Sequence, residues 1–419
     1  MMRFKKLLLT RFFIGCFILS VVFIYTSFNA LAVSTGETGM NFLKIANDVR
    51  GVGMGEANAA VADTVCALVW NPAGLAQLHA NEAHFMYNKW FQGISSQYVS
   101  CALPIYKTYR AGHAKNYGTV GMSVNYLSIE PIQGYDIKGD KTEELNAYDV
   151  SVSLAYARRL YKALHGGFSF KYLYETLADV NAQAFAVDIG LLIKTLTGVG
   201  LGFTVQNLGT NIKFIEEEGK LPENYKLGVS YNQDIFNQPL TIAFDVNMPN
   251  DNDVYCGVGL EYWIKDIIAV RSGYRSGMDV GEGLRLGMGI KTNLFQMDYA
   301  FAGFGELGST HRIGVTMRFG QGANMNRIAE LYNRGYTHFE QGRYSEAIRV
   351  FNYILKIEPK EKKALNMLQK SYKKLSNELN NVDRSRPSPV KLDEPKKKPG
   401  SMRINKVRKK GLKLSRISY

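Results

Sequence analysis

Apolar and polar residues alternate at period two along residues 311–319. One face carries Ile313, Val315, Met317 and Phe319, and the other carries Arg312, Gly314, Thr316 and Arg318. This alternation predicts a strand with one apolar and one polar face. A closing strand of a membrane barrel and a strand of a soluble sandwich both show it, so the remainder of the chain has to decide between them.

The same alternation recurs through residues 82–320 and predicts fourteen strands. They cover 82–91, 96–105, 117–130, 146–161, 164–177, 182–196, 198–208, 222–233, 238–247, 253–264, 266–276, 282–292, 293–303 and 309–319. Each is about as long as a strand that crosses a bilayer at a tilt. The pattern therefore predicts an all-β transmembrane barrel of about fourteen antiparallel strands. A soluble sandwich or propeller is the alternative, although no blade repeats are found.

Connection lengths favour the membrane barrel. The connections at 160–164, 195–198 and 264–266 are short, whereas 131–145 and 209–221 are long and polar. Short turns on one side and long loops on the other are typical of outer-membrane barrels. Several aromatic residues near strand ends would suit an interfacial girdle: Trp90, Tyr106, Tyr161, Trp263, Tyr274 and Phe319.

The N-terminus combines basic residues with the apolar run 12–28, followed by Ala30 and Ala32. This pattern predicts a secretory signal peptide over residues 1–32, with an uncleaved membrane anchor as the alternative. Residues 33–81 are rich in alanine and interrupted by glycine, which predicts short helices and turns packed inside a larger structure. Asn71 and Pro72 mark a turn or a helix start there.

Charge is concentrated at the two ends of the chain. The net charge of the 419 residues is +14, of which residues 1–11 contribute +4 and residues 381–419 contribute +10. The body is therefore neutral, which argues against a nucleic-acid partner. Residues 381–419 also hold four prolines and predict a disordered basic tail, which either contacts an anionic surface or is simply solvated.

The period becomes helical after Gln321. Residues 328–361 carry small and aromatic residues at the spacing of a tetratricopeptide (TPR) repeat, and a third helix is predicted to extend this segment to 379. The motif residues are Gly335, Gly342, Tyr344, Ala347, Phe351 and Pro359. The small residues allow two helices to approach closely. A helical hairpin without a binding role is the alternative.

The spacing of the reactive residues does not indicate a catalytic site or a metal site. The six histidines are scattered, and Cys66, Cys101 and Cys256 match neither a disulfide framework nor a zinc site. We therefore predict no enzyme activity, no metal and no cofactor. The polar strand faces carry Arg271, Arg275, Arg285, Lys291, Arg312 and Arg318, opposed by Asp188, Asp245, Glu261 and Asp298. A charge network inside the barrel explains these residues, with a carboxylate-binding site as the alternative.

These segments together resemble a known family. The stretches 42–46, 49–55 and 70–75, followed by a strand from Glu82, resemble the PorV/PorQ branch of the FadL-type outer-membrane proteins. The resemblance implies a fourteen-stranded barrel with an N-terminal hatch inside it, here residues 33–81. It assigns Asn71, Pro72 and Ala73 to the hatch motif.

The resemblance also implies a function. FadL-like members take up long-chain fatty acids or other hydrophobic small molecules, so the expected partners are outer-membrane lipid and a hydrophobic ligand. PorV-like members instead serve protein secretion, and the TPR-like segment 328–379 suggests a periplasmic or secreted protein partner. An even strand count places both barrel ends, the TPR segment and the tail in the periplasm.

Overall fold

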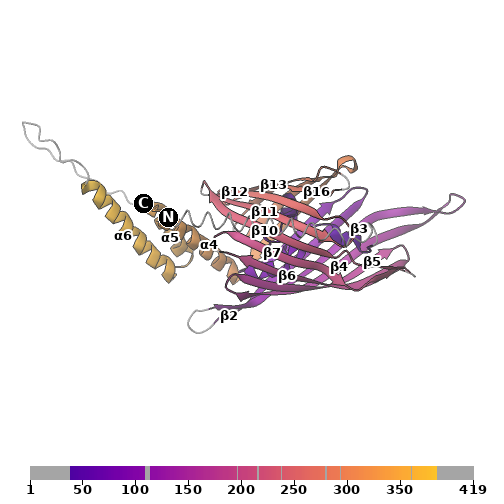
Figure 1. Cartoon of the computed structure of the whole chain (residues 1–419), viewed down its shortest axis with the longest axis horizontal. Coiled ribbons are helices and arrows are strands. Elements are labelled where there is room, and N and C mark those ends of the chain that lie inside the picture. The colour runs from indigo at the N-terminus through magenta and orange to yellow at the C-terminus, as the bar shows by residue number, and fades with distance from the viewer. Residues whose placement is uncertain are drawn as a thin grey trace, which may run out of the picture. The chain divides into compact units, whose positions relative to one another are not determined.

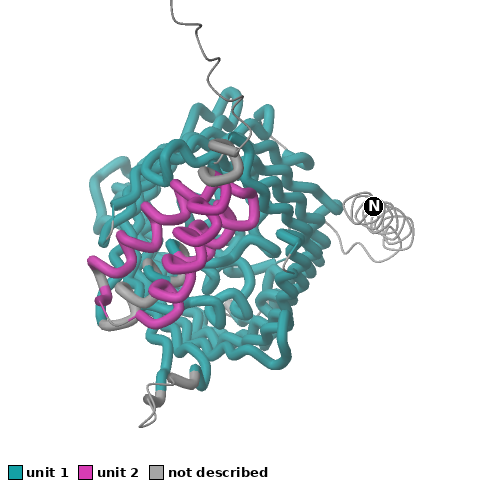
Figure 2. The backbone as a smooth tube through the Cα atoms, turned by 90° about the vertical axis from the view of Figure 1, so that its left-hand side faces the viewer, with its two compact units in different colours: residues 1–331 teal, residues 332–419 magenta. Residues whose placement is uncertain are grey.

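The computed structural model describes residues 38–108, 114–195, 197–214, 217–236, 238–278, 281–292, 294–359 and 361–384. The chain divides into two compact units, Met1–Leu331 and Tyr332–Tyr419 (Figure 2). The predicted signal peptide lies outside the described residues, as does the basic tail beyond Arg384.

Within the described part of the first unit, fourteen antiparallel strands form a closed barrel (Figure 1). They are β1 (Asn81–Lys89), β2 (Ile94–Thr108), β3 (Ala114–Tyr135), β4 (Lys141–Tyr161), β5 (Leu164–Leu177), β6 (Val180–Lys194), β7 (Val199–Gly209), β10 (Asn224–Ile235), β11 (Gln238–Pro249), β12 (Tyr255–Ile264), β13 (Ile268–Arg275), β14 (Leu284–Lys291), β15 (Phe295–Gly303) and β16 (Ser309–Phe319). The predicted barrel and its strand number are confirmed.

The first and last strands close the barrel. β1 pairs with β16 in continuous register from Asn81, opposite Phe319, to Lys89, opposite His311. We call the end with Asn81 and Phe319 the terminal end. The opposite end, where β3 connects to β4, is the hairpin end.

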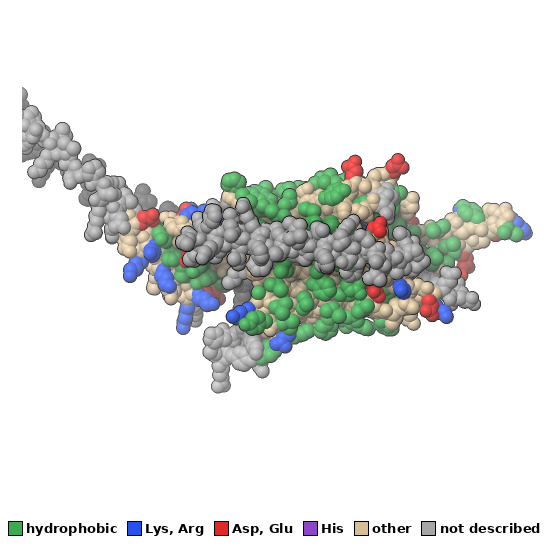
Figure 3. Space-filling model, viewed as in Figure 1, with side chains coloured by type: hydrophobic (Ala, Val, Ile, Leu, Met, Phe, Trp, Pro, Cys, Tyr) green, Lys and Arg blue, Asp and Glu red, His purple; other side chains and the backbone are tan. Residues whose placement is uncertain are grey.

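Side chains on the outer face of the barrel form an apolar belt (Figure 3). Exposed members on the last strands include Leu284, Leu286, Met288, Ile290, Phe295, Met297 and Ile313. At the hairpin end, Tyr126, Tyr148 and Tyr174 form a row across β3, β4 and β5, with ring centroids 6.0 and 6.2 Å apart. An apolar band bordered by aromatic rings is typical of a barrel in a bilayer.

The predicted girdle is wrong for two of its aromatic residues. The ring of Trp263 lies under Arg271 and Lys291, on the inner face of the barrel, and Trp90 lies under Arg312. Tyr106 is 36% exposed, and its hydroxyl donates to the carbonyl of Leu78. Position near a strand end does not decide which face a ring occupies, and the two tryptophans meet inward-facing partners.

Residues 38–80 fill the barrel as a hatch. Its short helices are η1 (Asn41–Lys44), α2 (Val49–Gly53), α3 (Ala67–Trp70) and η2 (Pro72–Gln77). η2 packs against β3 to β6, whereas α2 packs against β13 to β16 on the other side. The hatch therefore spans the interior from wall to wall, and most of its residues are buried.

Two connections at the hairpin end have more structure than expected. The predicted loop 131–145 is mostly a two-stranded extension of β3 and β4, which pair as far as Tyr135 and Lys141. The loop 209–221 contains the small hairpin β8 (Ile212–Phe214) and β9 (Glu217–Gly219). Ile212 and Leu221 pack there in one apolar cluster with hatch residues Met40 and Phe42.

The helical segment consists of α4 (Gln321–Glu340), α5 (Tyr344–Ile357) and α6 (Lys362–Arg384). Phe351 and Ala347 are fully buried, and a Cβ on Gly335 would lie 2.8 Å from the Phe351 ring, so glycine allows α4 and α5 to approach. Gly342 takes a φ of 76° in the turn before Tyr344, and Pro359 follows the end of α5. No described helix is both long and apolar enough to span a membrane.

Candidate functional site: a cavity beside the hatch

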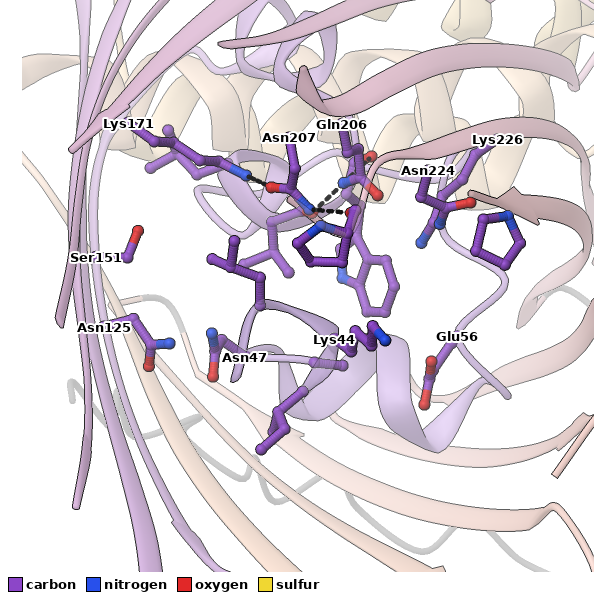
Figure 4. A pocket seen from close by; sticks show the side chains of 18 of the residues that line it. Lys44, Asn47, Glu56, Asn125, Ser151, Lys171, Gln206, Asn207, Asn224 and Lys226 are labelled. Atoms are coloured by element: carbon purple, nitrogen blue, oxygen red, sulfur yellow. Dashed lines mark hydrogen bonds between the residues drawn. The ribbon is translucent and has the colours of Figure 1, made fainter. Parts of the chain in front are cut away.

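A cavity of about 130 Å³ lies inside the barrel, between the hatch and strands of the hairpin end (Figure 4). Hatch residues Leu43, Ile45, Leu68, Val69 and Trp70 line its apolar part. Its polar part includes Lys44, Asn47, Asn125, Ser151, Lys171, Gln206, Asn224 and Lys226. The site thus offers an apolar surface next to a polar one that contains several cations.

Lys226 is the cation whose setting is most unusual. Its side chain is only 5% exposed, and its ammonium lies 4.5 Å from the centre of the Trp70 ring. A buried ammonium is costly unless it is compensated, and an aromatic face compensates only in part. Lys226 lines the cavity together with Glu56 of the hatch, whose carboxylate lies close enough for the two charges to act on each other.

A bulge in β7 shapes the neighbouring wall. The pairing of β6 with β7 shifts between Val187 and Ile189, and Asn207 takes a φ of 59°. The buried carboxylate of Asp188 accepts from the backbone N–H of Asn207 (2.8 Å) and pairs with Lys171 (2.7 Å). Gln206 is thereby directed to the hatch, where it donates to the carbonyl of Val69 at 2.7 Å.

Glu56 of the hatch lies among cations of the wall. Its carboxylate pairs with Arg275 at 2.9 Å. Burial alone would raise the pKa of Glu56, but Arg275, followed by Arg285, Lys226 and Arg312, lowers it below its ordinary value. One hatch carboxylate thus faces several wall cations.

Glycines on the wall allow the hatch backbone to touch it directly. A Cβ on Gly287 would lie 3.1 Å from the Cα of Gly53, and one on Gly273 would lie 2.0 Å from the nitrogen of Gly55. Similar close approaches occur at Gly167, Gly190, Gly202, Gly228, Gly257 and Gly259. Because no side chain separates the two backbones, the hatch leaves little room for water along these contacts.

Carboxylates of the wall satisfy backbone donors of the hatch. Asp245 on β11 accepts from the N–H groups of Asn58 (2.8 Å) and Ala59 (2.7 Å). Glu82 on β1 accepts from the N–H of Val65 at 2.8 Å. These N–H groups lie outside regular secondary structure, so the wall supplies acceptors that helices would otherwise provide.

A chain of charged contacts joins the hatch to the wall at the terminal end. Arg50 of the hatch forms a bidentate pair with Glu261, and Glu261 also accepts from Arg271 at 2.7 Å. Arg271 continues to Asp298, also at 2.7 Å. A second cavity of about 420 Å³ lies beside Arg50, lined mainly by polar residues. Of the predicted internal charge network, the contacts of Arg271 with Glu261 and Asp298 are present, whereas Asp188 pairs with Lys171. The partner Arg50 in the hatch was not foreseen.

Within the hatch, buried Asp48 organises the turn before α2. Its carboxylate accepts from the N–H groups of Arg50 (3.1 Å) and Gly51 (2.9 Å) and from the indole N–H of Trp70 (2.8 Å). It therefore caps α2 and fixes the ring that faces Lys226.

The predicted hatch motif lies at the start of η2. Asn71 accepts from the N–H of Ala73 (3.1 Å) and donates to the carbonyls of Ala59 (2.9 Å) and Leu191 (3.1 Å). Leu191 belongs to β6, so this one amide joins two parts of the hatch to the wall. Pro72 occupies the first helical position, where a missing N–H costs nothing.

Metal-binding side chains do not gather in the described residues. No group of three or more His, Cys, Asp or Glu side chains there is placed to hold a metal ion. Cys66, Cys101 and Cys256 are free thiols. The side chains that line the cavity offer apolar contact, hydrogen bonding and charge.

Comparison with known proteins gives one sequence match and several distant structural likenesses. A family model described as tetratricopeptide repeat matches residues 328–361. No curated protein matches the chain.

Among solved structures, the "CymD monoaromatic hydrocarbon channel" is similar at 10% identity and a TM-score of 0.47, with 65% of this chain and 98% of that chain covered. A Pseudomonas aeruginosa FadL homologue is similar at 9% identity and a TM-score of 0.42, with 65% and 98% covered. The Acinetobacter baumannii outer membrane protein Omp33 is similar at 10% identity and a TM-score of 0.36, with 57% of this chain and 98% of that chain covered. At these values the likenesses say nothing about what this chain binds.

Proposed function

We propose that this protein takes up hydrophobic small molecules across an outer membrane, in the manner of FadL-like transporters. The observation that carries the proposal is the cavity beside the hatch, which is lined by apolar residues such as Leu43 and Trp70 and by the ammonium of Lys226 next to the Trp70 ring. The apolar belt supports placement in a bilayer. A long-chain fatty acid would match the cavity chemically, with its chain on the apolar part and its carboxylate at Lys226.

The size of the cavity indicates that a ligand cannot pass without movement of the hatch. A cavity of about 150 Å³ holds a benzene-sized molecule, and this one is about 130 Å³. It therefore accommodates one end of a long molecule. Transit through the barrel requires the hatch to break contacts such as that between Arg50 and Glu261.

Uptake of a radiolabelled fatty acid by cells that make the protein tests the proposal. Cells with Lys226→Met should take up the fatty acid at a rate lowered by about tenfold, because a carboxylate loses its charge partner. Uptake of a neutral hydrocarbon should change little. Equal uptake by cells with and without the protein would refute transport.

A PorV-like role in protein secretion is the second candidate, and the TPR match at residues 328–361 favours it. Deletion of residues 332–419 separates the two roles. Normal ligand uptake with loss of a secreted cargo protein would favour secretion, whereas loss of uptake alone would favour transport.

For the orientation, we propose that the terminal end faces the periplasm together with the helical segment and tail. Protease added to intact cells should then cut only at the hairpin end, for example in the loop 209–221. Cleavage after residue 331 in intact cells would contradict this orientation.

A further inference from the structure

The extension of β3 and β4 has two unpaired edges. Pairing of β2 with β3 ends at Ile129, followed by a hydrogen bond from the N–H of Glu130 to the carbonyl of Gly93 (3.1 Å), and pairing of β4 with β5 ends at Ala147. We call residues 130–146, which continue beyond these pairs, the β3–β4 ribbon. It projects beyond the rest of the barrel at the right of Figure 1. Unpaired strand edges present N–H and C=O groups on which another strand can form.

The ribbon lies beyond the aromatic row that marks the edge of the apolar belt. Tyr126 and Tyr148 belong to that row, and the ribbon follows Tyr126 along β3 and precedes Tyr148 on β4. Its apolar side chains are therefore exposed to water and not to lipid: Ile132, Tyr135, Ile137 and Leu145 are between 44 and 104% exposed. Exposed apolar residues of this kind mark interaction surfaces.

Internal contacts keep the ribbon in strand form. Asp136 accepts at its Oδ1 atom from the N–H groups of Lys138 (2.8 Å) and Asp140 (2.9 Å), which closes the turn. The side chain of Gln133 donates to the carbonyl of Thr142 at 2.8 Å. A preformed ribbon costs a partner less ordering entropy than a flexible loop would.

Charge selects the partner. Residues 130–145 hold five carboxylates and two lysines, so the ribbon is acidic. Two copies of an acidic ribbon repel each other, and anionic lipid headgroups are repelled as well. The edge of β3 also contains Pro131, which has no N–H to donate. The edge of β4 is therefore the better template.

We propose that the β4 edge over residues 141–146 docks an extended, net-basic segment of a partner protein by strand addition. The segment would lie antiparallel to β4, in line with β5 and beyond the β5–β6 turn. That turn already uses the carbonyl of Asn146, which accepts from the N–H of Ala178 at 2.9 Å. Backbone pairing would provide affinity, and the ribbon carboxylates would provide selectivity. This proposal does not depend on the transport function.

The test uses the full chain in detergent micelles and three synthetic ten-residue peptides. One alternates Lys with Val, one alternates Glu with Val, and one is the Lys peptide with N-methyl groups at alternate residues. Fluorescence anisotropy measures binding, and hydrogen exchange measures protection of residues 141–146. We expect the Lys peptide to bind about tenfold or more tightly than either other peptide. Exchange at 141–146 should slow when it binds.

Two protein variants sharpen the result. Glu144→Lys should weaken binding of the Lys peptide, whereas Glu306→Lys, at an exposed position between β15 and β16, should leave it unchanged. Replacement of residues 132–145 by Asn-Gly should abolish binding while the barrel keeps its resistance to heat on gels. Equal binding of the Lys and Glu peptides, binding to the shortened variant, or protection without peptide through self-association would overturn the proposal.

Discussion

The contact between Asn71 and Gly190 offers a direct test of how the hatch is held. The Asn71 amide makes three hydrogen bonds, to Ala73, Ala59 and Leu191. From the wall side, a Cβ on Gly190 would lie 2.1 Å from the Oδ1 atom of Asn71. Asn71→Ala removes the hydrogen bonds, and Gly190→Ala pushes the amide out of place. Both changes should loosen the hatch while the strand pairing of the barrel remains.

The expected magnitude follows from the groups left unpaired. Loss of the helix cap costs about 1 kcal/mol, and an unpaired buried carbonyl adds about 1–3 kcal/mol. A net loss of about 2 kcal/mol in hatch docking raises the open population about 30-fold, since 1.4 kcal/mol corresponds to a factor of ten. Gly190→Ala should cost a similar amount, about 1–3 kcal/mol, through overpacking.

Hydrogen exchange of the purified protein measures the effect. Amides of residues 41–80 should exchange faster in both variants, while amides of the strands should not. Cells with either variant should admit polar antibiotics that the parent excludes. Gly303→Ala is the matched control, because the atom nearest to its added Cβ is 3.9 Å away.

The double variant decides whether the two residues act through one contact. In the Asn71→Ala background the Oδ1 atom is gone, so Gly190→Ala should cost less than it does alone. Additive effects would show that the two changes act separately. Unchanged exchange in both single variants would refute the role assigned to Asn71, and failure of the barrel to assemble would show that the motif is needed for folding.

Three further perturbations test other parts of the molecule. Leu286→Arg places a charge on the lipid face and should destabilise the barrel by about 2–4 kcal/mol, measured by thermal unfolding in liposomes. Gly287→Arg should destabilise the barrel at least as much, because a Cβ at this position would lie 3.1 Å from the hatch backbone. The pKa of Glu56 is lowered in the folded protein, so its contact with Arg275 should stabilise the hatch fully above pH 4.5. This stabilisation should be lost as the pH falls through the lowered pKa. Hydrogen exchange of the hatch should show this acid-dependent step in the parent protein and not in Glu56→Gln. Phe351→Ala should destabilise the helical unit by about 3–5 kcal/mol, measured as protease cleavage after residue 331 with an intact barrel.

The barrel was predictable from sequence because each strand repeats one simple rule. Period two separates a lipid-facing from an interior-facing side along a strand, as in residues 311–319. This pattern can be recognised in each strand by itself, without knowing which segments lie next to it. Residues 131–145 were interpreted as a loop because they are long and polar. In the structure, shifts of register near Pro131 and Gly134 allow the pairing of β3 with β4 to continue as far as Tyr135 and Lys141.

The contacts of the hatch could not be predicted in the same way. Gly273 and Gly287 lie on the polar faces of their strands, beside Arg271 and Arg285, but nothing local in the sequence shows that another backbone lies against them. Arg50 and Glu261 are 211 residues apart in the chain. The contact of Lys226 with the ring of Trp70 likewise joins two segments that are far apart in the chain, so the sequence did not predict it. These are long-range pairings that depend on how a segment without periodicity folds inside the barrel.

The short connection between η2 and β1 has a consequence for how the hatch can move. Only residues 78–80 separate the end of η2 from the first strand. A hatch that leaves its place stays tethered at Asn81, so it can swing about that point and cannot be lost. Reclosing is then an intramolecular event at a high effective concentration, independent of how much protein is present. The three-residue connection therefore limits how far the end of η2 can move from Asn81.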